Sequence, residues 1–317
     1  MLIEKYIEFN CPITTDKLTI LLLTTYNINP TKKTIVFLHG IGSNTDYFKE
    51  IFEKIYLLNN IQIIGINMVG NGYSSEIPNI ILNLQNIDLL NYFVKILDLV
   101  LLKLNYQDSY ENIHLVGHSF GAFLATHYTK FHTFYKLSLM APIGIFETTT
   151  HLGYYNGLFF KSGFVDLLYK ICNLLNLKFK YKNNLFVNKF ISFESFGTKS
   201  YWNITQFDHL NNLNIPIQLI YGYYDYIVPI HHSFLIYSLR KKNNLLTTLN
   251  IILHTSHEVI SLKKFHDIQE YKTCFNIDKS DSISTNIFRR YLSDNYCKLS
   301  DDILIYYDDS HIKHLFK

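Results

Sequence analysis

Short, uninterrupted runs of apolar residues alternate with longer amphipathic segments over most of this chain. Runs of this length and composition are typical of strands buried on both faces of a sheet. The sequence therefore predicts eight strands. They cover residues 5–9, 18–25, 34–38, 61–66, 113–116, 137–141, 215–221 and 249–253.

Several segments between these runs have the spacing of an amphipathic helix. From Tyr47 to Leu58, for example, Phe48, Phe52 and Ile55 share one face. Regular alternation of strands and helices indicates a doubly wound, mostly parallel α/β sheet, with the active site at the carboxyl ends of its strands. The other expected helices cover residues 87–104, 122–128 and 231–240, with one more from about residue 258.

Two regions depart from the alternation. Residues 144–208 are aromatic and rich in lysine, and they lack a strand-helix rhythm, so we expect a helical cap inserted after the sixth core strand. Residues 276–317 show no clear pattern and form a C-terminal extension of unknown role. The predicted core therefore comprises residues 1–143 and 209–275.

A serine flanked by glycines links the fifth predicted strand to a helix. The segment reads Gly117-His118-Ser119-Phe120-Gly121. Glycines two positions before and two after a serine allow a sharp, strained turn that leaves the hydroxyl exposed at the sheet edge. A glycine-rich turn without chemistry is the competing interpretation. A catalytic site also requires an acid, a base and oxyanion donors.

Candidates for the acid and the base follow the last two predicted strands. Asp225 comes just after the seventh strand, where a turn or helix-capping role is the alternative. His254 and His257 both follow the eighth strand. We favour His257, which follows a small residue and opens a helix, over His254, which lies nearer the strand. The order Ser119, Asp225, His257 is the order that strand-turn-helix serine hydrolases use.

A second glycine-rich loop follows the third strand and is the candidate for the oxyanion hole. We expect the backbone amide of Ile41 to point into the site and to act together with the amide of Phe120. The residues expected to support the two loops are His39, Gly40, Gly42, Gly117 and Gly121.

These segments resemble the α/β-hydrolase superfamily over about residues 15–270. The resemblance implies an α/β-hydrolase fold with an eight-stranded sheet, and a triad of Ser119, His257 and Asp225. A further stretch, residues 67–74, resembles the family's D-x-x-G-x-G-x-S turn. Here Asn67 replaces the aspartate, which affects local hydrogen bonding more than catalysis.

The serine also narrows the expected reaction. Related epoxide hydrolases and haloalkane dehalogenases carry an aspartate at this position, so Ser119 indicates transfer of an acyl group to water. Residues 117–124 and 139–147 resemble a subgroup that deacylates phospholipids, including lysophospholipases and cardiolipin deacylases. The acyltransferase signature His-x-x-x-x-Asp of that subgroup is missing, because Leu262 stands five residues after His257. Hydrolysis is therefore favoured over acyl transfer.

The expected cap adds an independent indication of a lipid-like substrate. A basic, apolar lid suits an anionic membrane surface and an acyl chain, so peripheral membrane contact is expected. The abundance of lysine throughout the chain offers a plainer explanation. An esterase of small soluble esters and a catalytically silent lipid-binding or scaffold relative remain alternatives. Between Lys161 and Lys189 the chain has one aspartate, Asp166, and six lysines: Lys161, Lys170, Lys178, Lys180, Lys182 and Lys189.

Composition excludes several other classes of function. A hydrophobic content of 48% with 17% charged residues is that of a globular protein, and a net charge of +3 is too small to indicate nucleic-acid binding. The four cysteines are scattered, so neither a disulfide framework nor a zinc site is expected, and no cofactor is implied. Without a signal-peptide pattern or a transmembrane run, we expect a cytoplasmic protein.

Overall fold

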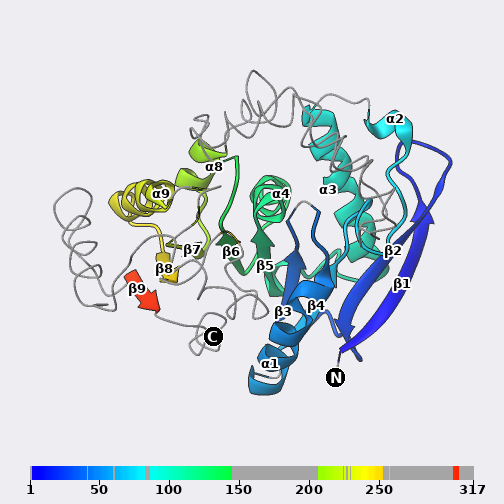
Figure 1. Cartoon of the computed structure of the whole chain (residues 1–317), viewed down its shortest axis with the longest axis horizontal. Helices are drawn as coiled ribbons and strands as arrows, with labels where there is room; N and C mark the ends of the chain where they lie inside the picture. The colour runs from blue at the N-terminus through cyan, green and yellow to red at the C-terminus, as the bar shows by residue number, and fades with distance from the viewer. Residues whose placement is uncertain are drawn as a thin grey trace, which may run out of the picture.

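A mixed sheet of nine strands organises the part of the chain that the structure describes (Figure 1). This computed structural model describes residues 2–40, 42–59, 61–82, 86–144, 206–223, 225, 228, 230–252, 257 and 303–306. Across the sheet the strands are β1 (Leu2–Asn10), β2 (Lys17–Thr25), β4 (Gln62–Ile66), β3 (Thr34–Leu38), β5 (Ile113–His118), β6 (Lys136–Met140), β7 (Ile217–Gly222), β8 (Thr247–Ile252) and β9 (Ile303–Tyr306).

The strand directions confirm the predicted fold class. The pairs β1–β2 and β2–β4 are antiparallel, and all the other neighbouring pairs are parallel. The strands β1 to β8 are the eight expected from the apolar runs. The ninth, β9, comes from the C-terminal region and extends the sheet in parallel to β8. At four residues it is too short for a periodic pattern to reveal it.

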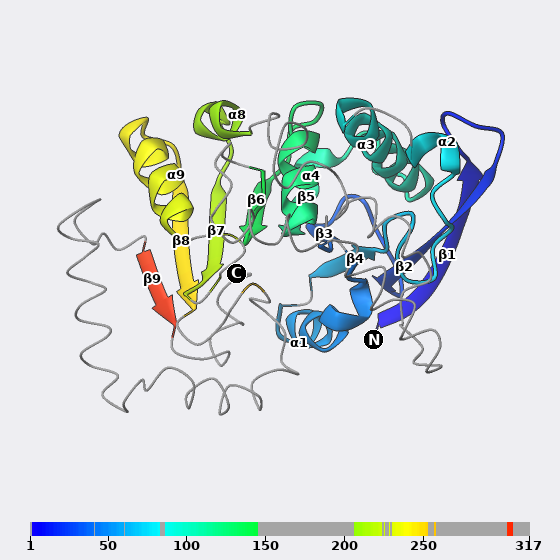
Figure 2. The same cartoon turned by 45° about the horizontal axis from the view of Figure 1, so that its top comes forward.

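Helices cover the sheet on both faces. Figure 2 shows α1 (Lys49–Asn59) on one face and α3 (Asn86–Lys103), α4 (Phe120–Tyr128), α8 (Phe207–Asn212) and α9 (His231–Lys242) on the other. A short helix, α2 (Asn79–Leu82), precedes α3, and a 3-10 turn, η1 (Thr45–Phe48), precedes α1. No helix in the described ranges is both long enough and apolar enough to cross a membrane.

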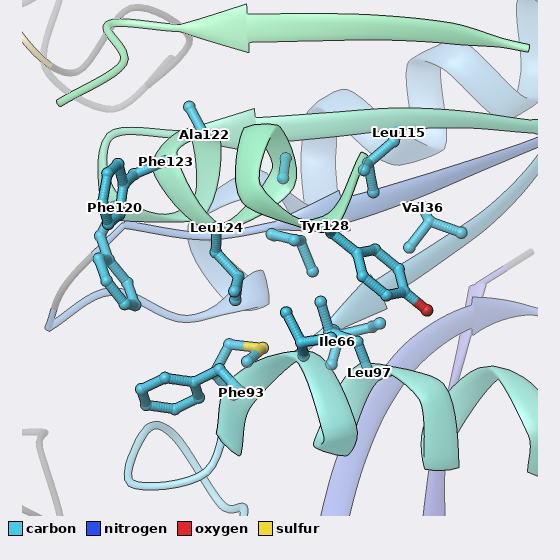
Figure 3. Packing of buried hydrophobic residues seen from close by; sticks show 14 of the residues in the cluster. Val36, Ile66, Phe93, Leu97, Leu115, Phe120, Ala122, Phe123, Leu124 and Tyr128 are labelled. Carbon is cyan, nitrogen blue, oxygen red and sulfur yellow. The ribbon is translucent and has the colours of Figure 1, made fainter. Parts of the chain in front are cut away.

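Burial on both faces explains why the strands read as continuous apolar runs. In β3, Ile35 and Phe37 face α1, whereas Val36 and Leu38 face the larger core beneath α3 and α4. The ring of Phe37 lies 4.4 Å from that of Phe48, centroid to centroid. Figure 3 shows part of the larger core, where side chains of α3, α4, β3 and β5 meet.

A buried arginine in α9 holds the chain that leads into β7. The Arg240 side chain is fully buried, and its guanidinium donates hydrogen bonds to the carbonyls of Leu210, Leu213 and Ile215. Its Nε atom also donates to Thr247 Oγ1 at 2.8 Å. Burial lowers the pKa of Arg240 to about 10, so the group remains charged at neutral pH. The carbonyl dipoles compensate this charge.

Little of the expected cap belongs to the described residues. Of residues 144–208, these include Gly144, Gln206 and the first two residues of α8. The rest of the cap, including its lysines, lies outside the described ranges, as does the helix expected from about residue 258. The expected domain boundaries therefore stay predictions.

A row of three buried polar side chains, those of His114, Ser138 and Gln218, runs across neighbouring strands of the sheet. His114 Nε2 donates to Ser138 Oγ at 2.7 Å, and Ser138 Oγ donates to Gln218 Oε1 at 2.8 Å. The row links β5, β6 and β7. Burial, with a smaller effect from the charge of Lys136, lowers the pKa of His114 to about 3. His114 is therefore neutral in the folded protein at ordinary pH.

The neutral state of His114 predicts a pH dependence of stability. Below pH about 6.5 the unfolded chain binds a proton at this histidine, whereas the folded chain does not until pH about 3. The free energy of unfolding should therefore fall as the pH falls from 6.5 toward 3. In urea unfolding series, His114→Gln should reduce this slope by up to about 1.4 kcal/mol per pH unit.

Ser138→Ala serves as the control for this experiment. It interrupts the same row of hydrogen bonds but retains the histidine, so it should lower stability while leaving the slope close to that of the wild type. Identical slopes for the wild type and His114→Gln would contradict the assignment of a neutral His114.

Candidate active site

Ser119 forms the turn between β5 and α4 and has a strained backbone. Its φ of 52° and ψ of −114° lie in a region that non-glycine residues rarely adopt. The Ser119 N–H donates to the Met140 carbonyl of β6 at 2.8 Å. Its carbonyl accepts bonds from the N–H groups of Ala122 and Phe123, both at 3.1 Å. Hydrogen bonds on both sides of the residue thus hold the strained geometry.

The glycines around Ser119 are required by close backbone packing. A Cβ atom on Gly121 would lie 2.1 Å from the carbonyl oxygen of Leu38, at the end of β3. A Cβ atom on Gly117 would lie 2.4 Å from the carbonyl oxygen of Gly121. Real Cβ atoms are not found at such distances. Helix α4 therefore packs directly on the backbones of β3 and β5, which explains why both positions lack a side chain.

The structure brings the three predicted triad residues together in one chain of hydrogen bonds. His257 Nε2 lies 2.8 Å from Ser119 Oγ, and His257 Nδ1 lies 2.9 Å from Asp225 Oδ2. Because a carboxylate accepts, Nδ1 carries the ring proton, and Nε2 is left to accept the hydroxyl proton. An arrangement of this kind can activate a serine as a nucleophile.

The acid in this chain is more deeply buried than the base. The Asp225 side chain is fully buried, and the His257 side chain is 13% exposed. Asp225 Oδ1 also accepts a hydrogen bond from the N–H of Val228 at 2.8 Å. Each carboxylate oxygen of Asp225 therefore has a donor, which holds the group in one orientation. His254, the alternative base, lies outside the described residues.

Of the two backbone amides expected to form the oxyanion hole, the structure describes that of Phe120. Phe120 is the first residue of α4, so its amide belongs to the N-terminus of the helix, next to Ser119. A helix N-terminus favours negative charge, because its backbone N–H groups point outward. The Phe120 ring packs on Phe93, 5.7 Å between centroids. Ile41 lies outside the described residues.

His39 holds the loop that follows β3 through two hydrogen bonds. Its Nε2 accepts a hydrogen bond from the N–H of Met68 at 3.1 Å, and its Nδ1 donates to the Gly40 carbonyl at 2.7 Å. Burial lowers the pKa of His39 to about 4, so the ring is neutral and can both donate and accept. The loop then turns, with the N–H of Ser43 donating to the Gly40 carbonyl at 3.2 Å and Gly42 at a φ of 66°.

Gly40 lies directly against the turn at Ser119. A Cβ atom at this position would lie 3.2 Å from Ser119 Cβ and 3.0 Å from His118 Nδ1. A side chain on Gly40 would therefore press on the candidate nucleophile and on the residue before it. This contact gives a steric reason for a glycine at position 40.

The asparagine that departs from the family pattern forms hydrogen bonds through both its amide oxygen and its amide nitrogen. Asn67 Oδ1 accepts from the N–H of Thr45 at 2.8 Å, and Asn67 Nδ2 donates to Thr45 Oγ1 at 2.9 Å. Ser74 Oγ donates to the Asn67 carbonyl at 2.6 Å. An ionised aspartate could not donate to a threonine hydroxyl, so the bond from Asn67 Nδ2 to Thr45 Oγ1 depends on the amide.

His118, to which no role is assigned from the sequence, makes a further polar contact at this site. Its Nε2 lies 2.8 Å from the backbone oxygen of His257, and the two rings are 5.1 Å apart, centroid to centroid. In the sequence, the only indication of this contact is the position of His118 directly before Ser119.

Within the described residues, no group of three or more histidine, cysteine or acidic side chains could hold a metal ion.

Comparisons with known proteins agree with this architecture. A family profile described as alpha/beta hydrolase fold matches residues 33–136. An esterase from Exiguobacterium antarcticum is 14% identical, with a TM-score of 0.54 over 81% of this chain and 95% of that protein. An α/β-hydrolase from a Medee basin deep-sea metagenome is 18% identical, with a TM-score of 0.55 over 83% and 96%.

An esterase from Pyrococcus furiosus has a TM-score of 0.54 at 16% identity, covering 87% of this chain and 88% of that one. A search of curated proteins found no match. At such low identity the likeness concerns the fold. The chain is therefore a protein of the α/β-hydrolase fold with distant structural similarity to esterases.

The close packing of α4 predicts that Gly121→Ala is strongly destabilising. The added methyl group would meet the backbone of β3, which cannot move without disturbing the sheet, so we expect a loss of about 3 kcal/mol or more in the free energy of unfolding. Gly65→Ala is the matched control. The atoms nearest to its Cβ belong to the side chains of Thr45 and Phe52 and not to backbone, so we expect a smaller loss. Urea unfolding should separate the two variants, and equal losses would contradict this account.

Proposed function

We propose that this protein is a serine hydrolase that cleaves carboxylic ester bonds through an acyl-enzyme intermediate. The observation that carries the proposal is the continuous hydrogen-bond chain from Ser119 through His257 to Asp225. Each of these residues follows a different parallel strand at its carboxyl end, where α/β proteins bind their substrates.

In the proposed reaction His257 first acts as the base. Its Nε2 takes the proton of Ser119 Oγ as the oxygen attacks the ester carbonyl, and the resulting imidazolium then protonates the leaving alcohol. In the second half of the cycle water attacks the acyl-enzyme with His257 again as the base, and the imidazolium then returns the proton to Ser119 Oγ as the carboxylic acid leaves. Asp225 accepts the hydrogen bond from the His257 Nδ1–H group and stabilises the imidazolium. Its carboxylate is buried and is fixed by the N–H of Val228.

The negative charge of the tetrahedral intermediate requires donors that are in place before the reaction. We assign this role to the backbone amides of Phe120 and Ile41. The position of Phe120 at the start of α4 supports its assignment, and the contact of Gly40, the residue before Ile41, with Ser119 supports the second. Loss of one such donor costs about 3 kcal/mol of transition-state stabilisation in serine hydrolases.

For the substrate we propose an acyl ester of a lipid or lysophospholipid. This assignment rests on the resemblance of residues 117–124 and 139–147 to phospholipid deacylases and on the basic, apolar composition of the cap. The same composition leads us to propose peripheral membrane contact through the cap. A small soluble ester is the second candidate, because proteins named as esterases share this fold.

The proposed mechanism predicts the effect of removing the nucleophile or the base. Ser119→Ala and His257→Ala should each lower kcat for an ester substrate by about 10⁴- to 10⁶-fold. The double variant should lose little more, because the two residues act in one step. Hydrolysis of p-nitrophenyl esters and covalent labelling by a fluorophosphonate probe provide the two measurements.

His114→Gln is the control for this experiment, because His114 lies on the same strand but belongs to the polar row across the sheet. It should retain wild-type labelling. A wild-type protein that is not labelled, or a Ser119→Ala protein that is labelled equally well, would overturn the proposed function. Measurable lipid binding by an unlabelled protein would instead support the silent lipid-binding alternative.

The substrate assignment predicts a preference for long acyl chains. Hydrolysis of p-nitrophenyl esters from acetate to palmitate, and of lysophosphatidylcholine, should give a kcat/KM that rises with chain length, since each buried methylene adds about 0.8 kcal/mol of binding. Ser119→Ala measures the background rate. A maximum at acetate or butyrate would reject the lipid substrate in favour of a small soluble ester.

A further inference from the structure

His118 lies between the proposed nucleophile and the proposed base. It is the last residue of β5, and only 3% of it is exposed. Its Nε2 lies 2.8 Å from the main-chain oxygen of His257. Because a carbonyl only accepts, Nε2 must carry a proton and donate it. The residue before the serine is thus hydrogen-bonded to the main chain of the base.

The His118 ring is held on several sides. Its centroid lies 5.9 Å from that of Phe48 and 5.1 Å from that of His257. The position that a Cβ atom on Gly40 would occupy is only 3.0 Å from His118 Nδ1. The backbone of His118 pairs with Met140 in β6. Surroundings of this kind leave the ring little freedom, so its donor points in a fixed direction.

We propose that His118 is a positioning residue, which ties the main chain of His257 to the strand that carries Ser119. The proposal rests on the serine-hydrolase function proposed above. His257 is 138 residues from Ser119 in the sequence, so no local structure aligns the two. The Asp225 bond orients the ring of His257, and the His118 bond locates its backbone.

This division of tasks has a kinetic consequence. A base whose backbone can shift would still leave the substrate-binding surface intact, so KM should change little. Proton transfer from Ser119 Oγ to His257 Nε2 depends on the 2.8 Å distance between these two atoms, so its rate should fall. A displacement by about 1 Å can cost on the order of 10²-fold in rate. The expected signature is therefore a fall in kcat at nearly constant KM.

Two amide substitutions test the proposal, because they differ in reach. The side-chain nitrogen of glutamine in His118→Gln can occupy the position of the histidine Nε2 and donate to the His257 carbonyl. The shorter asparagine in His118→Asn reaches only the position of Nδ1. We expect kcat to fall about 10²-fold for His118→Asn. His118→Gln should recover most of this loss, and the rate of fluorophosphonate labelling should follow the same order.

A purely structural role for His118 would give a different result. Both amide variants replace a buried ring, so their melting temperatures should fall together, and activity measured well below both temperatures removes that effect. The pair His114→Gln and His114→Asn, on the same strand, should lose stability without a selective loss of kcat.

The outcomes separate this inference from the proposed function. If the wild type is labelled at Ser119 and both His118 variants retain the wild-type kcat, or lose it equally, the positioning role is overturned while the hydrolase function stands. A wild type without labelling overturns the proposed function and this inference with it. A selective loss in His118→Asn, rescued in His118→Gln, supports both.

Discussion

The arrangement at this site depends on the close contact between α4 and the backbones of β3 and β5. Gly121 allows α4 to approach the carbonyl of Leu38 in β3. Gly117 allows the same helix to pass over the end of β5, the strand that leads into it. The chain can reverse direction in so short a distance only if Ser119 takes a positive φ. The strain is tolerated because the bond from Ser119 N–H to the Met140 carbonyl anchors the residue to β6.

Parallel strand direction is the second constraint, and it determines where the polar groups gather. Ser119 follows β5, Asp225 follows β7 and His257 follows β8. The carboxyl ends of parallel strands lie at one edge of the sheet, so residues far apart in the sequence meet there without a long loop. The two antiparallel strands, β1 and β2, lie at the opposite side of the sheet and contribute none of the three residues.

The histidines near this edge illustrate how burial divides one residue type among different tasks. His39 and His114 are buried and neutral: His39 holds the loop after β3 through hydrogen bonds of both ring nitrogens, and His114 Nε2 bonds Ser138 within the sheet. His118 donates to a main-chain carbonyl. His257 alone among these four lies between a serine hydroxyl and a carboxylate. The partner atoms, and not the residue type, distinguish a structural histidine from a candidate base.

Local pattern was enough to predict the strands β1 to β8 and the turn at Ser119, because apolar periodicity and glycine spacing are encoded over a few residues. It also proposed Ser119, Asp225 and His257 as one site, and the structure joins these three residues by hydrogen bonds. It did not reveal β9, whose four residues are too short to show a period, or the pairing of Asn67 with Thr45 and of His118 with His257. Those contacts join segments that are distant in the sequence. Only the packed sheet decides which of them meet, because a hydrogen bond depends on distances that the order of residues does not contain.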